Sequence, residues 1–373
     1  TFQASGNPTS GSSRTNAAVT FTPSTNYFFG ASVYKDTNDI DFNFGSPPYT
    51  ISSGNADGKP SDYFSTALWT GNGSGATITG VGFQPDWVWE KSRSATYNHN
   101  LIDSVRGANK VLESNNGETQ ATKDNTLMSF NSDGFVYGAN AGWSNNNSTF
   151  VAWNWKAGTS FSNSAGANGA DIASSGSVNT DAGFSIITAT SNSSANKKIA
   201  HGLGAVPGVI ISKNLDTGYG WDVYFKTLGY NASLQLNSVA AVRTGAWGST
   251  TFTSTFFQTG DDYSSKNGSP YIYYCFTEKQ GYSKFSQYRG NGNANGSFIY
   301  TGFSPAFLMI KQTAASNDWF MIDNKREPFN PNNVQLVANG TSASTNKGDL
   351  DLLSNGFKPR SSNAAWNENN AQY

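Results

Sequence analysis

The residues best suited to general acid–base catalysis are the two histidines, His99 and His201. His99 lies in the polar turn Asn98–Asn100, so we expect its side chain to be solvated rather than to act as a general base. His201 precedes the glycine of a turn that recurs along the chain, and the equivalent positions hold Val81 and Thr301, so we interpret it as structural. The sequence has no Gly-x-Ser-x-Gly nucleophile elbow between a strand and a helix, which argues against a serine hydrolase.

Carboxylates are the second group of side chains that could be catalytic. A polysaccharide-cleaving enzyme needs two of them across a groove, about 5–10 Å apart. The candidates are Asp86, Glu90, Asp103 and Asp323. Because they fall on turns and strand ends, we interpret them as structural and predict no catalytic residue, and a polysaccharide depolymerase is kept only as the second alternative function.

Metal-binding patterns are weak. The oxygen-rich segments Asp36–Asp41 and Asp261–Asp262 leave Ca²⁺ possible, but neither has the glycine and distal glutamate of an EF-hand loop. The single cysteine, Cys275, allows no intramolecular disulfide, and its apolar surroundings predict a buried strand residue. No cluster of cysteine and histidine exists for zinc, and no cofactor is predicted.

Ten tryptophans and seventeen tyrosines offer a binding chemistry instead, because exposed aromatic rings stack on sugars. Four tryptophans in apolar runs are expected in the core, namely Trp87, Trp89, Trp153 and Trp155. Four others lie near loops rich in glycine, serine and asparagine and are the predicted ligand-binding residues: Trp69, Trp143, Trp247 and Trp366. Packing against a neighbouring subunit and anchoring of the loops remain open as alternatives.

The composition indicates which elements must position these residues. Of 373 residues, 14% are aromatic and only 13% charged, with abundant glycine, serine, threonine and asparagine, which predicts strands and turns rather than helices. A net charge of −1 provides no basic field for nucleic acid. No apolar run is long enough to span a membrane, so membrane insertion is not predicted.

A turn of the form Gly-hydrophobic-x-Pro that leads through an apolar run to lysine occurs three times. The copies are Gly82–Lys91, Gly202–Lys213 and Gly302–Lys311. Proline is tolerated at a strand start, where its missing N–H costs no ladder bond. Further matching segments follow in the same order, so we predict three diverged all-β, sandwich-like repeats of about 100–120 residues each.

The predicted organisation has five parts. Residues 1–60 form a lead-in, a hairpin within Tyr27–Gly45 and a linker; residues 61–160 form repeat one; residues 161–180 form a flexible, glycine- and serine-rich linker. Residues 181–284 form repeat two and residues 285–373 repeat three. A lone hairpin is marginally stable, and repeat three stops before the strand that closes the other two copies. We therefore expect the sequence to be cut short at both ends.

The repeated block resembles a domain family of unknown function that occurs, often in tandem, in structural proteins of marine bacteriophages. The resemblance is carried by Gly82–Asp86, Lys91–Arg93, Asp103–Gly107, Ser129–Phe135 and Val151–Gly158. The hairpin, which ends in Phe42–Tyr49, is similar to the last strands of a SPRY-like or concanavalin-like β-sandwich. The family has no known catalytic residues to carry over.

The resemblance implies a virion protein at the particle surface, such as a tail fibre or appendage, which is not an enzyme. It would contact other virion proteins and recognise a host-surface glycan or protein by multivalent weak binding, as a homo-oligomer that phage fibres suggest is a trimer. The first alternative is purely architectural: a spacer or decoration of the capsid or tail that binds nothing outside the particle.

Overall fold

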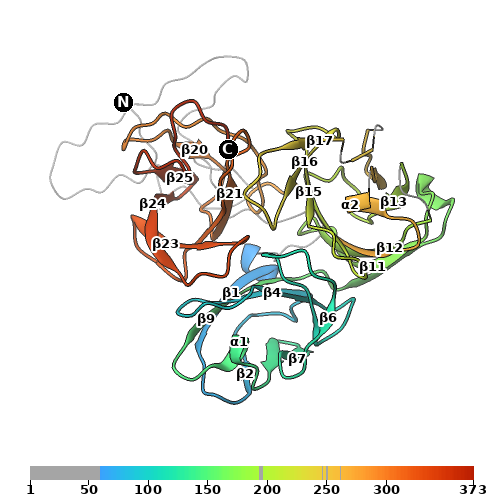
Figure 1. Ribbon diagram of the computed structural model, residues 1–373, viewed down its shortest axis with the longest axis horizontal. Helices are drawn as coiled ribbons and strands as arrows, with labels where there is room; N and C mark the ends of the chain where they lie inside the picture. Colours follow the sequence, from blue (N-terminus) through green and yellow to red (C-terminus); the bar gives the residue numbers. More distant parts are fainter. Residues whose placement is uncertain (1–58, 193–195, 246, 249–250, 261) are drawn as a thin grey trace, which may run out of the picture. The chain divides into compact units, whose positions relative to one another are not determined.

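The computed structural model describes residues 59–373, apart from residues 193–195, 246, 249–250 and 261. The predicted hairpin at Tyr27–Gly45, its similarity to a SPRY-like sandwich and the candidate calcium ligands Asp36–Asp41 lie outside the described residues. Nearly all regular elements are short antiparallel strands, which confirms the predicted all-β fold (Figure 1). The strands form three lobes, defined here as residues 59–158, 159–279 and 280–373.

Lobe one contains a sheet in the order β1-β9-β3-β4, a second sheet in the order β2-β8-β7 and the pair β5-β6. Its elements are η1 (Pro60–Asp62), β1 (Phe64–Thr70), β2 (Ala76–Ile78), β3 (Trp87–Ser92), β4 (Asn100–Asp103), β5 (Lys110–Val111), β6 (Ala121–Thr122), β7 (Leu127–Asn131), β8 (Gly134–Tyr137), α1 (Ala141–Ser144) and β9 (Thr149–Trp155).

Lobe two is built on a sheet in the order β10-β11-β12-β19-β14-β15-β16-β17 and the pair β13-β18. Its elements are β10 (Thr159–Asn163), η2 (Ala167–Gly169), β11 (Ser174–Asn179), β12 (Phe184–Thr190), β13 (Lys198–Ala200), β14 (Val209–Asn214), β15 (Asp222–Phe225), β16 (Ala232–Gln235), β17 (Arg243–Thr244), β18 (Phe256–Gln258), α2 (Asp262–Ser265) and β19 (Pro270–Phe276).

Lobe three has a sheet in the order β20-β25-β24-β23-β22-β21. Its strands are β20 (Ile299–Tyr300), β21 (Phe307–Lys311), β22 (Trp319–Asp323), β23 (Asn332–Val337), β24 (Thr345–Leu353) and β25 (Gly356–Pro359).

The strand registers align the three copies residue by residue. Trp87 pairs with Asp103 in lobe one, Val209 with Phe225 in lobe two and Phe307 with Asp323 in lobe three. The recurrent turn therefore enters β3, β14 and β21 as predicted. In lobes one and two this strand also pairs on its other edge with a closing strand, β9 or β19, beyond which lies an opening strand, β1 or β12.

The principal sheets are buried on both faces. Alternate residues of β3 and β9, such as Trp87 and Trp153, join a core cluster that contains residues from all three lobes. The residues between them, such as Val88 and Ala152, enter a second core inside lobe one. Lobes two and three each have a comparable core of their own. This explains why the repeated strands are continuous apolar runs rather than alternating ones.

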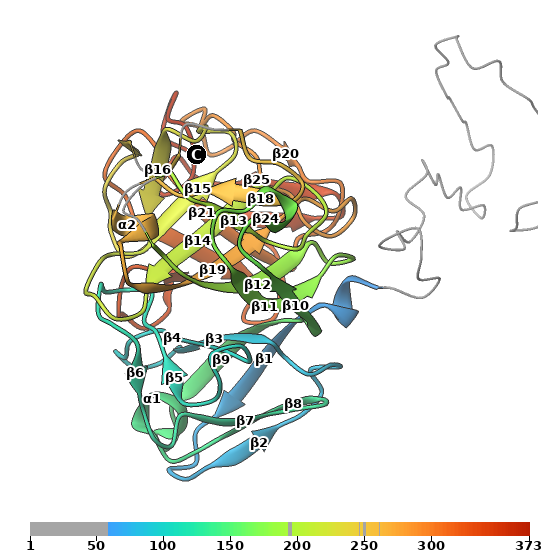
Figure 2. The ribbon, with the colours of Figure 1, turned by 90° about the vertical axis from the view of Figure 1, so that its right-hand side faces the viewer.

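Figure 2 shows lobe one lying against the other two lobes. Aromatic side chains join lobes one and two in the shared core. The ring of Trp87 stacks on Tyr274 with 4.3 Å between centroids and on Phe184 with 5.8 Å. Phe307 of lobe three packs 5.5 Å from Trp153 and 5.9 Å from Phe64. The three repeats are therefore lobes of one packed unit.

The predicted flexible linker at residues 161–180 is corrected by the structure. β10 pairs with β11, and β11 pairs with β12, at the edge of the large sheet of lobe two. Its serines and glycines belong to paired strands, of which β10 is the edge strand of the sheet, rather than to a hinge. Ser174, for instance, is buried and its hydroxyl donates to the Ala200 carbonyl at 2.9 Å.

Candidate functional site

The four tryptophans predicted as ligand contacts do not share one surface. Trp143, Trp247 and Trp366 are at most 3% exposed and pack inside the cores of lobes one, two and three, respectively. Trp69 is half-buried, stacks on Phe150 and donates its indole N–H to the Trp143 carbonyl at 3.0 Å. Stacking on a sugar needs an open ring face, which three of the four do not offer in this conformation. Their geometry matches the loop-anchoring alternative.

Residues that bridge the lobes form the most distinctive cluster of buried polar groups. The expectation of a solvated His99 is wrong, because this side chain is fully buried. The indole N–H of Trp89 donates to His99 Nδ1 at 2.9 Å, and His99 Nε2 lies 2.9 Å from the Val337 carbonyl oxygen. Since Nδ1 accepts, Nε2 carries the hydrogen and donates across the junction between lobes one and three. Burial lowers the pKa of His99 to about 3, so the ring is neutral.

The same bond recurs at the other two junctions with tryptophan in place of histidine. The register aligns His99 with Trp221 and Trp319. Trp221 of lobe two donates to the Glu113 carbonyl of lobe one at 2.8 Å. Trp319 of lobe three donates to the Gln235 carbonyl of lobe two at 2.9 Å. Lobe one thus binds lobe three, lobe three binds lobe two and lobe two binds lobe one, which closes a cycle.

A second cycle of backbone bonds runs in the opposite sense. Each bond joins an amide of one lobe to the carbonyl at the end of the recurrent strand in the next. The three are Gln120 N–H to Leu215 at 3.0 Å, Val242 N–H to Thr313 at 2.9 Å, and Ser344 N–H to Arg93 at 2.7 Å. These three bonds fix the register of each lobe against its neighbour.

The lysines that end the recurrent turn are buried near the junctions. Lys213 donates to the carbonyl of Gly117 in lobe one at 3.2 Å, and Lys311 donates to that of Val239 in lobe two at 3.0 Å. Burial lowers the pKa of Lys91, Lys213 and Lys311 to about 8 in each case. Their ammonium groups are held by carbonyl oxygens, which are structural contacts.

The candidate carboxylates also serve the junctions. Asp103 binds Arg106, and Asp323 binds Arg326, each pair with 2.5 Å between carboxylate oxygen and Nε. Both acids accept a further bond from a closing strand of another lobe. Tyr274 donates its hydroxyl to Asp103 at 2.7 Å, and the Trp153 indole donates to Asp323 at 3.0 Å.

The remaining two candidates are buried as well. Asp86 accepts bonds from the Ser104 hydroxyl and the Ala157 amide, both at 2.8 Å. Glu90 is fully buried beside Asn100, and burial raises the pKa of its carboxyl well above the usual value. All four predicted carboxylates are therefore enclosed by protein rather than facing one another across an open groove, as a glycoside hydrolase requires.

His201 belongs to the core of lobe two. It is fully buried, Nδ1 accepts the Leu203 amide at 3.2 Å, and Nε2 lies 3.2 Å from the Thr253 carbonyl oxygen. Burial lowers its pKa to about 4. The placement agrees with the structural interpretation, as does that of Cys275, whose buried thiol has a raised pKa.

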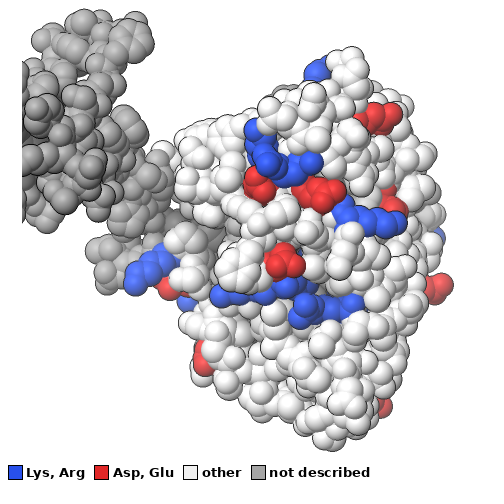
Figure 3. All heavy atoms as spheres, turned by 90° about the vertical axis from the view of Figure 1, so that its left-hand side faces the viewer, with Lys and Arg blue, Asp and Glu red and all other residues white. Residues whose placement is uncertain are grey.

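The surface drawn in Figure 3 is mostly uncharged, with basic and acidic side chains lying beside one another. Within the part of the chain that the structure describes, no group of three or more His, Cys, Asp and Glu side chains could hold a metal ion. Over the same residues, no helix is long and apolar enough to cross a membrane. Two aromatic side chains are exposed at the start of β20, however: Phe298, which directly precedes the strand, is 47% exposed, and Tyr300 within it is 62% exposed.

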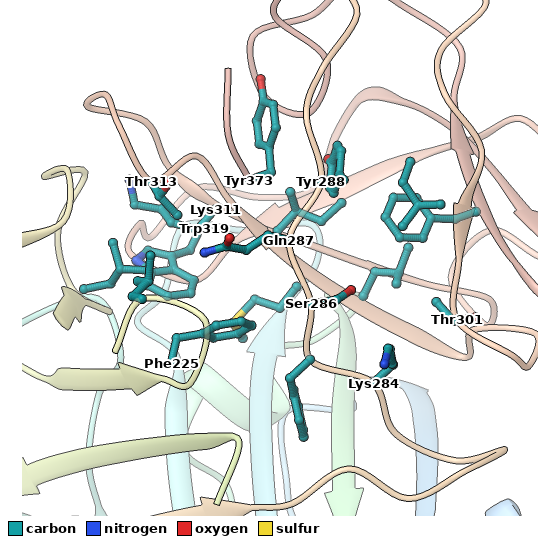
Figure 4. Close-up of a pocket in the computed structure, with 18 residues that line it drawn as sticks. Phe225, Lys284, Ser286, Gln287, Tyr288, Thr301, Lys311, Thr313, Trp319 and Tyr373 are labelled. Atoms are coloured by element: carbon teal, nitrogen blue, oxygen red, sulfur yellow. The ribbon is translucent and has the colours of Figure 1, made fainter. Parts of the chain in front are cut away.

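A cavity of about 130 Å³ lies between lobes two and three (Figure 4). Its lining is largely apolar and comes from Phe225, Leu228 and Leu234 of lobe two, from β21, and from the segment 284–288. None of the four candidate carboxylates lines it. The apolar part of its lining can pack against apolar side chains.

The junction residues were missed at the sequence level although a signal for them exists. Alignment of the three recurrent turns places His99 at the same position as Trp221 and Trp319. A residue that recurs as a large aromatic ring in the sister copies is expected in a core rather than in a solvated turn. The sequence gives no means of knowing that the ring reaches a carbonyl in another copy.

Comparison with known proteins yields one family. Residues 59–373 match the model of DUF7483, described as a domain of unknown function. The single match covers all three lobes. No curated protein and no solved structure matches the chain.

Proposed function

We propose, from the premise that the chain belongs to the DUF7483 family, that it is a non-catalytic structural component of a bacteriophage particle. The observation that carries the non-catalytic, architectural part is the closed cycle of ring N–H bonds from His99, Trp221 and Trp319 to the next lobe. The assignment to a phage rests on the resemblance of the repeated motifs to domains found in phage structural proteins.

The closed cycle of bonds between the lobes should make the three lobes rigid relative to one another. A chain of three lobes joined end to end could bend at two junctions, whereas a cycle cannot open at one junction without breaking a contact elsewhere. The buried ionisable groups support the same interpretation, because Asp103, Asp323 and Lys213 are held by partners within the fold. In an enzyme such groups would face a substrate cleft.

Labelling of particles tests the architectural role. Antibodies against the purified chain should decorate intact phage particles from the source of the sequence, at a regular position on the tail or capsid surface. The purified chain should release no reducing ends from bacterial surface polysaccharides. Absence of the chain from purified particles, or such release, would contradict the proposal.

Recognition of a host surface is the second candidate, and an exposed aromatic pair at the start of β20 favours it. Tyr300 belongs to β20 and Phe298 directly precedes that strand; both side chains are exposed, while Ile299 between them is buried. Two adjacent aromatic rings can stack on a sugar chain. The pair differs from the tryptophans named above in that both rings are accessible.

Binding to a panel of bacterial surface glycans and whole cells tests this candidate. Tyr300→Ala should weaken saturable binding about tenfold, since loss of one stacking ring removes on the order of 1 kcal/mol or more. Phe329→Ala is the matched control, because Phe329 is an exposed aromatic residue, 77% exposed, outside the pair. Equal binding by both variants and the parent would exclude this pair as the recognition site.

A further inference from the structure

One edge of the sheet in lobe three differs from its counterparts. β3 and β14 each lie between two strands, and all their residues are buried. β21 pairs with β22 alone, and within residues 280–373, all of which the structure describes, no strand pairs with its other edge. Phe307, Leu308 and Met309 of β21 are only half-buried. Of the three recurrent strands β3, β14 and β21, β21 is thus the one that is partly uncovered.

The start of a closing strand is nevertheless in place. In lobe one, Arg93 N–H donates to the Thr149 carbonyl at the beginning of β9, and in lobe two, Leu215 N–H donates to that of Pro270 at the beginning of β19. In lobe three, Thr313 N–H donates to the Gln372 carbonyl at 2.9 Å. Gln372 and Tyr373 therefore occupy the positions that the first two residues of β9 and β19 occupy in lobes one and two.

The same two residues also contact the segment that corresponds to the opening strand. Tyr288 and Tyr373 exchange two backbone hydrogen bonds, of 3.2 and 3.0 Å, and Arg289 pairs with Gln372. Gln372 and Tyr373 thus lie between the segment 285–289 and the end of β21, as β9 and β19 lie between their own neighbours.

The cavity between lobes two and three is lined by the same segments and by Tyr373. Its lining includes Phe285, Ser286 and Gln287 of the segment 285–289 and Leu308, Met309 and Ile310 of β21. These are the two segments that a closing strand would separate. We propose that the slot between segment 285–289 and β21 binds one further antiparallel strand, an extended segment with aromatic or apolar side chains at alternate positions, as in β9 and β19.

The residues of lobe two that face the slot determine the chemistry of one side chain of the incoming strand. In the other two junctions the closing strand presents Trp153 or Tyr274, whose N–H or O–H meets an aspartate that is paired with arginine. In lobe two, Phe225 and Leu228 stand at the positions of that aspartate and arginine. They offer no acceptor, so the incoming strand carries an apolar side chain here, and a charged one is excluded by the cost of burial.

This inference does not depend on a role in a virus particle, and two probes test it. The first is the full chain with the sequence of residues 151–157 added after Tyr373, carrying Trp153→Phe so that the side chain over Phe225 is apolar. The second is a synthetic peptide of residues 151–157 with the same change, added to the unmodified chain, in which Gln372 and Tyr373 already hold the positions of residues 149 and 150. Each has a matched control in which the same position carries Trp153→Lys.

The readouts are the unfolding temperature and hydrogen exchange of the backbone amides in residues 307–311. The added strand should raise the unfolding temperature by several degrees and slow exchange in β21, and the peptide should bind saturably with protection of the same amides. The lysine controls should lose at least about tenfold in affinity.

Unchanged exchange in β21 with both probes, or equal effects of the phenylalanine and lysine versions, would overturn the proposal. Dimers of the unmodified chain that already protect residues 307–311 would also overturn it, because the occupant would then be a second copy. An intact fold of each extended chain is verified by its near-ultraviolet circular dichroism.

Discussion

His99 Nε2 donates to the carbonyl oxygen of Val337 at 2.9 Å, although 238 residues separate the two in the sequence. This bond joins lobe one to lobe three and completes the cycle that Trp221 and Trp319 form at the other junctions. The neutral ring is held by both nitrogens, since Nδ1 accepts from Trp89. A single side chain therefore links the core of one lobe to the backbone of another.

Removal of this ring should destabilise the whole chain. His99→Ala leaves a cavity and deprives the Trp89 indole and the Val337 carbonyl of their partners. We expect the free energy of unfolding to fall by about 3 kcal/mol, as measured by urea unfolding. A loss below about 0.5 kcal/mol, the usual range for a surface substitution, would show that the junction bond does not matter.

The equivalent residues in lobe three suggest a double variant that should restore the stability lost by a change at His99. Lobe three holds Met309 and Trp319 where lobe one holds Trp89 and His99. The double variant Trp89→Met, His99→Trp copies that arrangement, and it should recover most of the stability that either single change loses. Additive losses in the double variant would indicate that the two lobes are not interchangeable at this position.

Acid should destabilise the protein through its buried histidines. The pKa of His201 is about 4 in the folded chain, against about 6.5 when unfolded. Between these values the unfolded state binds more protons, so the free energy of unfolding falls as the pH is lowered from 6.5, by up to about 1.4 kcal/mol per pH unit for this group.

The variant His201→Gln tests this assignment, because glutamine can still donate to the Thr253 carbonyl but does not titrate. Stability measured from pH 6.5 to pH 4.5 should depend less steeply on pH in the variant than in the parent. Glu90 acts in the opposite direction, since the pKa of its carboxyl is raised by burial, but its contribution is common to both proteins. Parallel pH curves would refute the assignment.

The buried lysines should make the protein more stable as the pH is raised above 8. The pKa of Lys213 is about 8 in the folded chain and about 10.4 when unfolded, so the unfolded state binds more protons between these values. The contribution of Lys213 therefore rises as the pH is raised from 8, by up to about 1.4 kcal/mol per unit. In urea unfolding measured from pH 7.5 to pH 9.5, Lys213→Met should show a smaller rise in the free energy of unfolding than the parent. An equal rise in the two proteins would contradict the assignment.

The segment 161–180, for which the sequence predicts a flexible linker, should resist proteolysis. Residues 159–179 contain β10 and β11, both paired within the sheet of lobe two. Brief treatment with proteinase K should give no cut in this segment, as judged by fragment masses, until urea unfolds the whole chain. A cut here in the native protein that separates lobe one from lobes two and three would show that the lobes are independent domains.

The local pattern of residues determined much of this fold. Continuous apolar runs after a proline turn predict buried strands, and they form β3, β14 and β21. The prediction that Trp87, Trp89, Trp153 and Trp155 belong to the core is confirmed, because a large aromatic ring within such a run has no solvated face. Three copies in the same order predict three similar units, and the strand registers place Trp87, Val209 and Phe307 at equivalent positions.

Only the tertiary structure decided how the copies combine. The positions of His99, Asp103 and Lys213 in turns and at strand ends are equally compatible with solvent exposure and with burial, because local sequence does not specify what lies across from a strand end. Their partners are Val337, Tyr274 and Gly117, each in a different lobe. The same limit applies to residues 161–180, whose small polar side chains suit both a flexible linker and an edge strand. The sequence alone thus determined the strands and their repetition, whereas the cycle of junctions depends on contacts between residues far apart in the chain.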